Sequence, residues 1–190
     1  MNAIGYRYEA DGWGMGEIWV DGTTLLVHDL AGSVPEQPLR DRSETATRKP
    51  KPLSPQGRRK PPSGTVAGTP SQDCAGFVSE VCRRFQAHLA GDPVSYDDIV
   101  VDVDLGTPFQ DALLRAVRSV PWGEVASYGE IAALAGRPGA ARAAGTFCAG
   151  NDLALVVPCH RIVASSGIGG YGSAGVQLKR RLLALERIRL

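Results

Sequence analysis

The segment Pro158-Cys159-His160-Arg161 places three side chains capable of chemistry next to one another. Apolar residues flank this segment at 153–157 and 162–164, and an apolar run of this kind is typical of a buried strand or core. Burying a thiol, an imidazole and a guanidinium costs free energy unless each group finds a partner. Histidine and arginine can both stabilise a thiolate, which is the nucleophilic form of cysteine. The pattern therefore predicts that Cys159 is a nucleophile.

The composition restricts the class of protein. The chain has 190 residues, 43% of them hydrophobic, which is enough for a substantial core. Its four cysteines are widely spaced, the first residues contain no apolar signal segment, and no apolar run approaches 18 residues. We therefore expect a cytoplasmic monomer with free thiols that uses no membrane and no cofactor.

The charge is unevenly distributed along the chain. Residues 107–190 carry ten Lys or Arg against five Asp or Glu, although the net charge of the whole chain is only +1. Residues 1–30 and 73–106 are acidic, with three basic residues against twelve acidic ones. A basic C-terminal half indicates contact with a polyanion, although ordinary variation of surface charge could also produce it.

The sequence predicts an α/β (α+β) fold in two domains, with a boundary near residue 106. Residues 1–106 are expected to form a small antiparallel sheet of three short strands within 3–30, a helix over 72–89 and a further strand over 98–105. Residues 31–72 hold eight of the thirteen prolines and almost no large apolar residues, so we expect a disordered insertion there.

Residues 107–190 are expected to form a mainly helical domain. Thr107 and Pro108 are typical of a helix start, and they precede an amphipathic helix over 109–120. Ser127 and Glu130 have the spacing of a capping box, which predicts a short helix over 128–135. A Gly/Pro turn then leads to an alanine-rich helix over 140–149, and the pair is typical of a helix-turn-helix. A Gly-rich loop over 165–175 and a basic helix over 177–189 end the chain.

The order of these features closely resembles that of the O6-alkylguanine-DNA alkyltransferases, also called methylated-DNA–protein-cysteine methyltransferases. The resemblance covers 107–190 and depends on the helix-turn-helix, Asn151, the run Val157-Pro158-Cys159-His160-Arg161-Ile162-Val163, the Gly/Tyr loop and the last helix. It implies direct reversal of DNA damage: the alkyl group of O6-alkylguanine, and of O4-alkylthymine in some relatives, passes irreversibly to the protein's own cysteine. The implied partner is double-stranded DNA carrying alkylated guanine.

The resemblance also assigns roles to individual residues. Cys159 is implied to be the acceptor, His160 its base acting through a water, and Glu186 the residue that orients His160. Arg142 is implied to fill the space left by the flipped base, and Tyr128 to contact the target's phosphate and base. The alanine-rich helix, beginning with Ala140 and Ala141, is implied to enter the minor groove. The expected turn and pocket residues are Asn151, Arg161, Ile162, Tyr171 and Ser173.

Three features depart from the family's pattern. Asp152 stands where the family commonly has proline, the segment 167–171 is one residue short, and the insertion at 31–72 is not typical of the family. None of them removes the acceptor cysteine or its relay.

Other readings of the sequence remain open. A lesion-binding damage sensor without transfer activity would lack the cysteine, and a helix-turn-helix regulator would not need the Cys-His-Arg segment. A cysteine hydrolase would need a distant histidine, which only His28 or His88 could supply. These two histidines with Cys74 and Cys82 suggest zinc, but their spacing does not match a structural zinc site, so we predict no metal.

Overall fold

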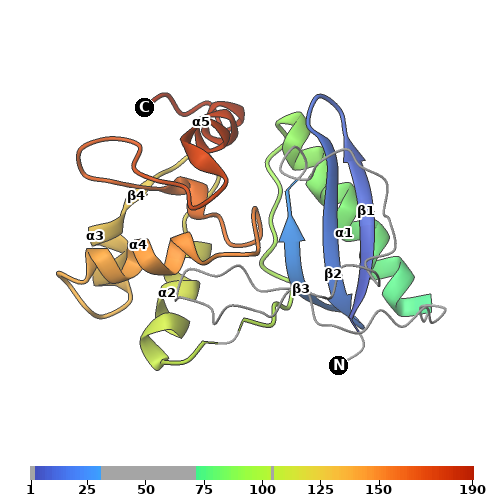
Figure 1. Cartoon of the computed structure of the whole chain (residues 1–190), viewed down its shortest axis with the longest axis horizontal. Coiled ribbons are helices and arrows are strands. Elements are labelled where there is room, and N and C mark those ends of the chain that lie inside the picture. The colour runs from blue at the N-terminus through green and yellow to red at the C-terminus, as the bar shows by residue number, and fades with distance from the viewer. Residues whose placement is uncertain (1–2, 31–71, 104) are drawn as a thin grey trace, which may run out of the picture.

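A three-stranded antiparallel sheet forms the first part of the chain. The computed structural model describes residues 3–30, 72–103 and 105–190 (Figure 1), so the insertion expected at 31–72 lies almost wholly outside the described residues. The strands β1 (Ile4–Ala10), β2 (Gly14–Asp21) and β3 (Thr24–Asp29) are hydrogen-bonded in the order β1-β2-β3. The expected meander is confirmed.

Helix α1 (Gln72–Ala90) covers one face of this sheet (Figure 1). Its fully buried Phe85 stacks on the ring of His28 from β3, with ring centroids 3.9 Å apart. The hydroxyl of Tyr8 lies 2.7 Å from Nε2 of the same histidine. The four-residue spacing of apolar residues thus predicted this helix correctly, and it packs through the face that carries Phe85.

The strand expected over 98–105 is not formed. Within the described residues of that range only Val101 bridges the sheet, pairing in parallel with Leu25. The amide of Leu25 donates to Val100 and the amide of Asp102 donates to Leu25. The alternating residues therefore form an extended connection beside the sheet, held at one point, rather than a fourth strand.

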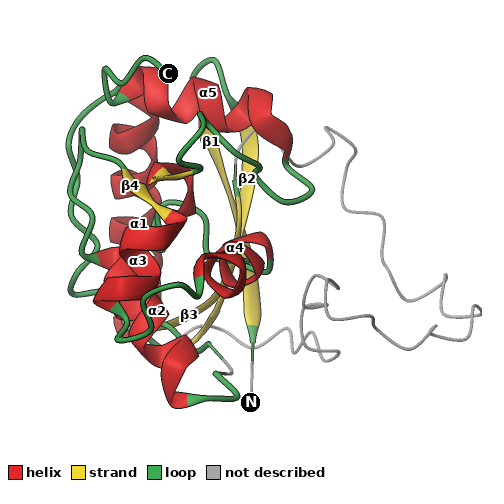
Figure 2. Cartoon of the chain, turned by 90° about the vertical axis from the view of Figure 1, so that its left-hand side faces the viewer, coloured by secondary structure: helices red, strands yellow, loops and turns green. Residues whose placement is uncertain are grey.

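The helices of the second part begin where their capping residues predict. Helix α2 (Pro108–Arg118) has Thr107 as its N-cap, and α3 (Tyr128–Leu134) begins with the capping box of Ser127 and Glu130. Helix α4 (Ala141–Ala149) follows α3 across a tight turn and packs against it, so the helix-turn-helix is present. Figure 2 shows α2, α3 and α4 on the side of the molecule facing the viewer, with α5 above them.

The apolar run before Cys159 is a compact loop and not the strand expected there. Leu155 has a left-handed backbone (φ 68°), and the amides of Val156 and Val157 donate to carbonyl groups within the loop. Cys159–Arg161 form a 3₁₀ turn, and only Ile162–Val163 form a strand, β5, which pairs in parallel with β4 (Ala126–Ser127). Backbone hydrogen bonds within turns therefore replace the hydrogen bonds between strands that we expected for this run.

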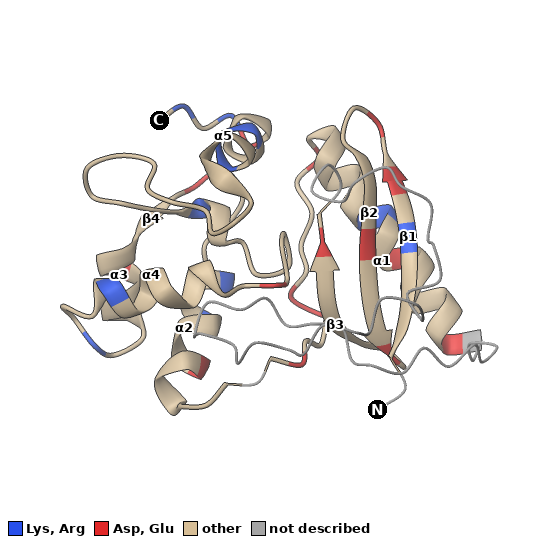
Figure 3. Cartoon of the chain, in the orientation of Figure 1, with Lys and Arg blue, Asp and Glu red and all other residues tan. Residues whose placement is uncertain are grey.

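The last helix, α5, spans Gly175–Leu185 and is shorter than expected. Glu186 is its C-cap and Arg187 has a left-handed backbone (φ 62°), so the chain leaves the helix there. Basic residues gather on α5 and the segment after it, whereas acidic residues are frequent around the sheet (Figure 3).

One hydrophobic core extends through both parts of the chain. It joins residues of the sheet and α1 to residues of α2, α3 and the Cys159 loop. The amide of His28 donates to Asp152, and Nδ1 of His28 lies 2.5 Å from the carbonyl oxygen of Ala154. The sheet therefore supports the Cys159 loop directly. None of the described helices combines the length and apolar character needed to cross a membrane.

Candidate active site

Local hydrogen bonds place Cys159 at the bend between the loop and β5. Pro158 (φ −78°, ψ 60°) forms an inverse γ-turn, in which the amide of Cys159 donates to Val157 at 2.8 Å. Asn151 closes the loop from the other side, because its Nδ2 donates to the Val157 carbonyl at 2.9 Å and its Oδ1 accepts from the amide of Leu153 at 3.1 Å. Asn151 therefore holds the loop before Cys159 in its turn conformation through two side-chain hydrogen bonds.

The thiol of Cys159 is buried and uncharged in the resting protein. Only 2% of the residue is exposed. A hydrogen bond with the Cys148 thiol raises the pKa of Cys159 well above its ordinary value, and burial raises it further, while Lys179 and Asn151 oppose them. We expected His160 and Arg161 to stabilise the thiolate at rest, but the groups that act on the sulfur are those of Cys148, Lys179 and Asn151.

His160 and Glu186 form a buried pair behind Cys159. Nε2 of His160 lies 2.8 Å from Oε1 of Glu186, and neither side chain is exposed. Burial lowers the pKa of His160 to about 4, against the opposing effect of Glu186, so the ring is neutral at pH 7. Burial acts to raise the pKa of Glu186, but the hydrogen bond from His160, the nearby ring of His88 and the hydrogen bonds from Arg161 together lower it, so Glu186 is a carboxylate.

This arrangement leaves one nitrogen of His160 available. If Nε2 donates to the carboxylate, Nδ1 is the acceptor of the neutral ring, and this tautomer follows from the hydrogen bond. Nδ1 is buried and has no hydrogen-bond partner within the described part of the chain. A buried imidazole with a free acceptor nitrogen and a carboxylate on its other nitrogen has the form of a general base with its orienting group.

Arg161 lies with Glu186 and not in the substrate pocket where we expected it. Its Nε lies 3.0 Å from Oε2 of Glu186, its Nη2 lies 3.0 Å from Oε1, and its Nη1 donates to the carbonyl of Val120 at 2.7 Å. The reason is electrostatic, since a buried guanidinium needs a carboxylate and carbonyl groups around it. Arg161 therefore neutralises the charge of the carboxylate that holds His160.

A buried lysine that we did not expect at the site acts on Cys159 through its charge. Nζ of Lys179, in α5, donates to the carbonyl oxygens of Ile162 and Gly170. Burial lowers the pKa of Lys179 to about 8. Lys179 shares its helix face with Leu182, Leu183 and Glu186, so a lysine at apolar spacing was the signal that could have found it.

The residues expected to contact DNA lie on the helix-turn-helix. Arg142 is exposed on α4, and Ala140 and Ala141 are half-buried at the start of that helix. Ala140 provides no side-chain cap, so it leaves the first amides of α4 without one. Tyr128 begins α3, and its hydroxyl donates to Gly170 in the Gly-rich loop at 3.4 Å. Burial raises the pKa of Tyr128 to about 12, so the hydroxyl keeps its proton.

The Gly-rich loop lies close over Tyr128. Gly169 has φ 69°, and a Cβ at this position would lie 3.1 Å from the amide nitrogen of Ala164 and 3.3 Å from the Tyr128 ring. Only glycine fits such an approach without a shift of its neighbours. The segment 167–171 therefore packs against Tyr128 at the start of α3.

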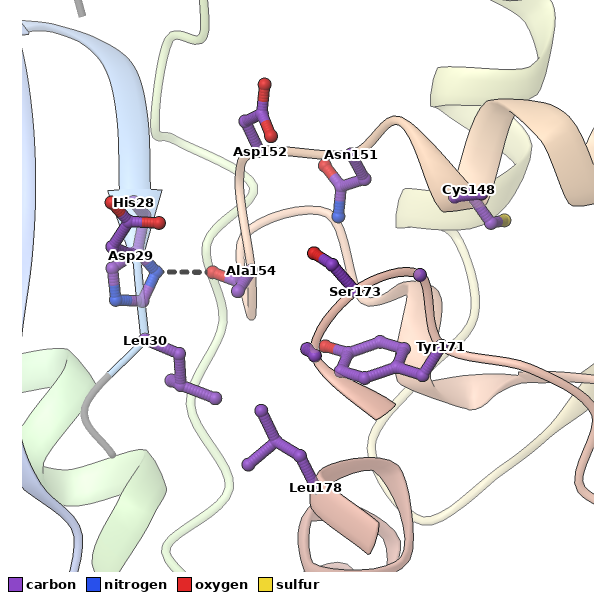
Figure 4. A pocket seen from close by; sticks show the side chains of 13 residues that line it. His28, Asp29, Leu30, Cys148, Asn151, Asp152, Ala154, Tyr171, Ser173 and Leu178 are labelled. Carbon is purple, nitrogen blue, oxygen red and sulfur yellow. Dashed lines mark hydrogen bonds between the residues drawn. The ribbon is translucent and has the colours of Figure 1, made fainter. Parts of the chain in front are cut away.

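A pocket lies between the sheet, the Cys159 loop and α5 (Figure 4). Tyr171, Ser173, Asn151 and Cys148 line it on the side of the helical part, and His28, Asp29 and Leu30 line it on the side of the sheet. The figure shows the ring of Tyr171 pointing toward this space. Cys159 and Ile162 do not line the pocket, so it lies beside the acceptor sulfur and is not the space directly over it.

The side chains around Glu186 include the one group in the described ranges whose geometry could suit a metal ion. Ligand atoms of His88, His160 and Glu186 lie within 4.8 Å of one another. Arg161, however, donates to both oxygens of this carboxylate, and a divalent cation there would lie against the guanidinium charge. The residues therefore do not fit a metal site.

Comparison with known proteins places the chain in a family. The family model for the DNA-binding domain of 6-O-methylguanine DNA methyltransferase matches residues 108–188. The chain is 44% identical over 116 residues to the methylated-DNA–protein-cysteine methyltransferase of Mycobacterium bovis, and this alignment covers 60% of the chain and 68% of the relative.

The chain belongs to the O6-methylguanine DNA methyltransferase family. It is also 49% identical over 82 residues to the methylated-DNA–protein-cysteine methyltransferase of Salmonella typhimurium, over 43% of the chain and 47% of that relative. A crystal structure of Mycobacterium tuberculosis OGT in complex with DNA matches with a TM-score of 0.64 and 30% identity, over 96% of this chain and 92% of that one. The methyltransferase fold therefore includes the N-terminal sheet as well as the helix-turn-helix.

Proposed function

We propose that this methyltransferase-family chain repairs DNA by transferring the alkyl group of O6-alkylguanine to its own Cys159, once per molecule. The observation that carries this proposal is the buried Cys159-His160-Glu186 arrangement, in which the ring of His160 is neutral, anchored through Nε2 and open at Nδ1. A cysteine held this way needs a base before it can attack an alkyl carbon.

The proton step uses His160 through one bridging water. Cys159 and His160 are successive residues of a 3₁₀ turn, so their side chains point about 120° apart and do not face each other directly. The thiol proton passes to the water and the water's proton to Nδ1 of His160. The resulting imidazolium is stabilised by Glu186, whose oxygen already lies 2.8 Å from Nε2.

The transfer step forms one bond and breaks one. The Cys159 thiolate attacks the alkyl carbon, the carbon–sulfur bond forms, and the bond from that carbon to O6 breaks with its electron pair passing to guanine. Tyr128, whose hydroxyl keeps its proton, then donates toward N3 of the leaving base in place of its bond to Gly170. The thioether has no route back to a thiol in this scheme, so the reaction is stoichiometric.

The raised pKa of Cys159 suits a residue that can react only once. A protonated, buried thiol is a poor nucleophile toward small electrophiles that reach the pocket by chance. Deprotonation is then tied to the binding of a flipped base against Tyr128 and the Cys159 loop. Flipping costs a few kcal/mol and costs least for a poorly paired base, which favours damaged guanine.

Double-stranded DNA is the proposed partner, bound through the helix-turn-helix. Exposed Arg142 is the long basic side chain on α4, whose other side chains near it are small. Such a helix can approach the minor groove closely while Arg142 takes the place of the flipped base. The crystal structure of the mycobacterial OGT, which was solved in complex with DNA, supports this assignment.

We further propose that residues 107–190 carry the chemistry and that residues 1–106 support it, in a cytoplasmic protein. The family model begins at residue 108, which supports the boundary. The bonds from His28 to Asp152 and Ala154 support a buttressing role for the sheet. No disulfide joins the four cysteines, all of which lie in the described residues, as expected of a protein kept in a reducing compartment.

The test is a single-turnover assay with duplex DNA that carries one O6-methylguanine labelled in its methyl group. We expect label on the protein to reach one methyl per molecule and the lesion to become guanine. Cys159→Ala should transfer nothing, whereas Cys82→Ala, which removes a half-buried thiol of α1, should transfer normally. Turnover beyond one methyl per molecule, or lesion binding without transfer, would contradict the proposal.

A further inference from the structure

A second buried histidine reaches the relay from the N-terminal half. His88, near the end of α1, is fully buried, and its Nε2 lies 3.6 Å from Oε1 of Glu186. Its ring centroid is 6.1 Å from that of His160. Neither ring nitrogen of His88 has a hydrogen-bond partner within the described residues. Because such burial normally costs free energy, the presence of a histidine here calls for an explanation.

Packing alone does not require a histidine at this position. The ring contacts Trp122 edge-on at a centroid distance of 4.7 Å and stacks on Tyr96 at 5.8 Å. A phenylalanine or leucine could make these apolar contacts without leaving two polar nitrogens buried. An apolar residue could not reproduce the contact between Nε2 and Oε1 of Glu186.

Oε1 of Glu186 faces the side chains of His88, His160 and Arg161, while Oε2 accepts from the amide of Gly123. Nε2 of His160 lies 2.8 Å from it, and Nε and Nη2 of Arg161 lie 3.1 and 3.0 Å from it. With both imidazoles neutral, the carboxylate and the guanidinium cancel. Each further donor that approaches Oε1 reduces the negative charge available to stabilise a proton on His160.

We propose that His88 is a positioning residue of the relay, which directs the N–H of Nε2 toward Glu186 Oε1 at 3.6 Å and, by this electrostatic contact, keeps His160 neutral and able to accept a proton. The groups that face His88 agree with this direction. Burial is the largest cause that lowers the pKa of His88, Glu186 opposes it, and Arg161 adds to it, so His88 is an uncharged donor. His28 and Tyr96 are the remaining titratable neighbours, and both are buried and uncharged at pH 7.

The role of His88 in alkyl transfer rests on the proposed function, but its coupling to His160 can be measured without DNA. The chain has three histidines, so their ring signals in a histidine-labelled sample can be assigned with single variants. The experiment follows the His160 ring by NMR against pH in the wild-type chain, in His88→Leu and in His88→Gln. The Gln amide can donate where Nε2 of His88 does, whereas Leu cannot donate.

In the wild-type chain and in His88→Gln, we expect His160 to stay neutral down to about pH 4 to 5. In His88→Leu, the midpoint of the His160 titration should move to higher pH, by about 0.5 to 1 pH unit. The acid limb of the methyl-transfer rate should move in the same direction, since transfer requires neutral His160. His88→Phe provides a second apolar variant, shaped to fit between Tyr96 and Trp122, if His88→Leu does not fold.

The proposal is overturned if a folded apolar variant titrates at the wild-type midpoint, or if His88→Gln behaves like the apolar variants. A wild-type chain that transfers no methyl group would refute the proposed function, while the His160 titration would still decide whether His88 controls the ring. A normal transfer rate with an unmoved midpoint would leave the proposed function intact and refute this inference alone.

Discussion

Removing the carboxylate of Glu186 should destabilise the protein more than any surface change. In Glu186→Ala, the guanidinium of Arg161 stays buried and loses its contacts of 3.0 to 3.1 Å, and His160 loses its partner at 2.8 Å. Breaking a buried ion pair on one side costs about 3 to 5 kcal/mol in free energy of unfolding. For a chain of this size, Tm should fall by about 6 to 20 °C.

Replacing both partners should restore part of this loss. In Arg161→Met/Glu186→Leu neither charge of this pair remains buried, and the remaining cost is that of the unpaired Nε2 of His160, the amide of Gly123 and the carbonyl of Val120, about 1 to 3 kcal/mol for each. Urea unfolding followed by circular dichroism measures the wild-type chain, Glu186→Ala, the double variant and its two single variants, Arg161→Met and Glu186→Leu. Glu80→Ala is the matched control, because Glu80 is an ion-paired but exposed glutamate of α1, and its loss should change little.

The stability that Glu186 contributes should depend on pH. The pKa of Glu186 is lowered in the folded state, so its contribution is present above the unfolded pKa of about 4.3 and is lost as pH falls below it. If Glu186→Ala costs less than about 1 kcal/mol, or if the double variant loses the sum of the two single losses, the buried ion pair does not hold the relay together.

Three further predictions follow from the buried thiol, the histidines and the exposed arginine. Cys148→Ala removes the hydrogen bond that is the largest cause of the raised pKa of Cys159, so iodoacetamide should alkylate Cys159 faster than in the wild-type chain at pH 8. Peptide mass spectrometry measures this rate, and an unchanged rate would mean that the two thiols are not coupled. Burial lowers the pKa of His28 to about 3, of His160 to about 4 and of His88 below its ordinary value. The unfolded chain therefore binds more protons than the folded protein below about pH 6.5, and the free energy of unfolding should fall by up to about 4 kcal/mol per pH unit near pH 5. A free energy of unfolding that does not change with pH in this range would contradict the prediction. Arg142→Ala should slow methyl transfer from duplex DNA about tenfold or more, while the rate of transfer from the free O6-methylguanine nucleoside and the protein's stability stay unchanged. Arg115→Ala, which removes an exposed arginine of α2, is the control. If Arg142→Ala and the wild-type chain react at equal rates on duplex DNA, Arg142 takes no part in base flipping.

The elements with strong local signals could be predicted from the sequence. Thr107 with Pro108, and Ser127 with Glu130, fix the starts of α2 and α3 because the caps act within a single turn. The Gly-containing turns and the spacing of Phe85 on α1 act over similarly short distances. The residue types of the Cys159 segment are sufficient by themselves to predict a nucleophile there.

The remaining features depend on contacts between distant segments. The loop before Cys159 reads as a strand, but Asn151 and the left-handed Leu155 fold it into turns. Arg161 reads as a neighbour of the thiol, but its partner Glu186 lies 25 residues further along the chain. His88 is separated from Glu186 by an even longer segment, and no spacing rule connects a helix of the first part to the end of α5.

The most direct measurement of the central claim is peptide mass spectrometry after the protein reacts with duplex DNA carrying one O6-methylguanine. The account predicts the mass of one methyl group on the peptide that contains Cys159, on every reacted molecule, and none on the peptides of Cys74, Cys82 or Cys148. Cys159→Ala should remain unmodified on all of its peptides. A methyl group on another residue, or an unmodified Cys159 in protein that has removed the lesion, would contradict the account.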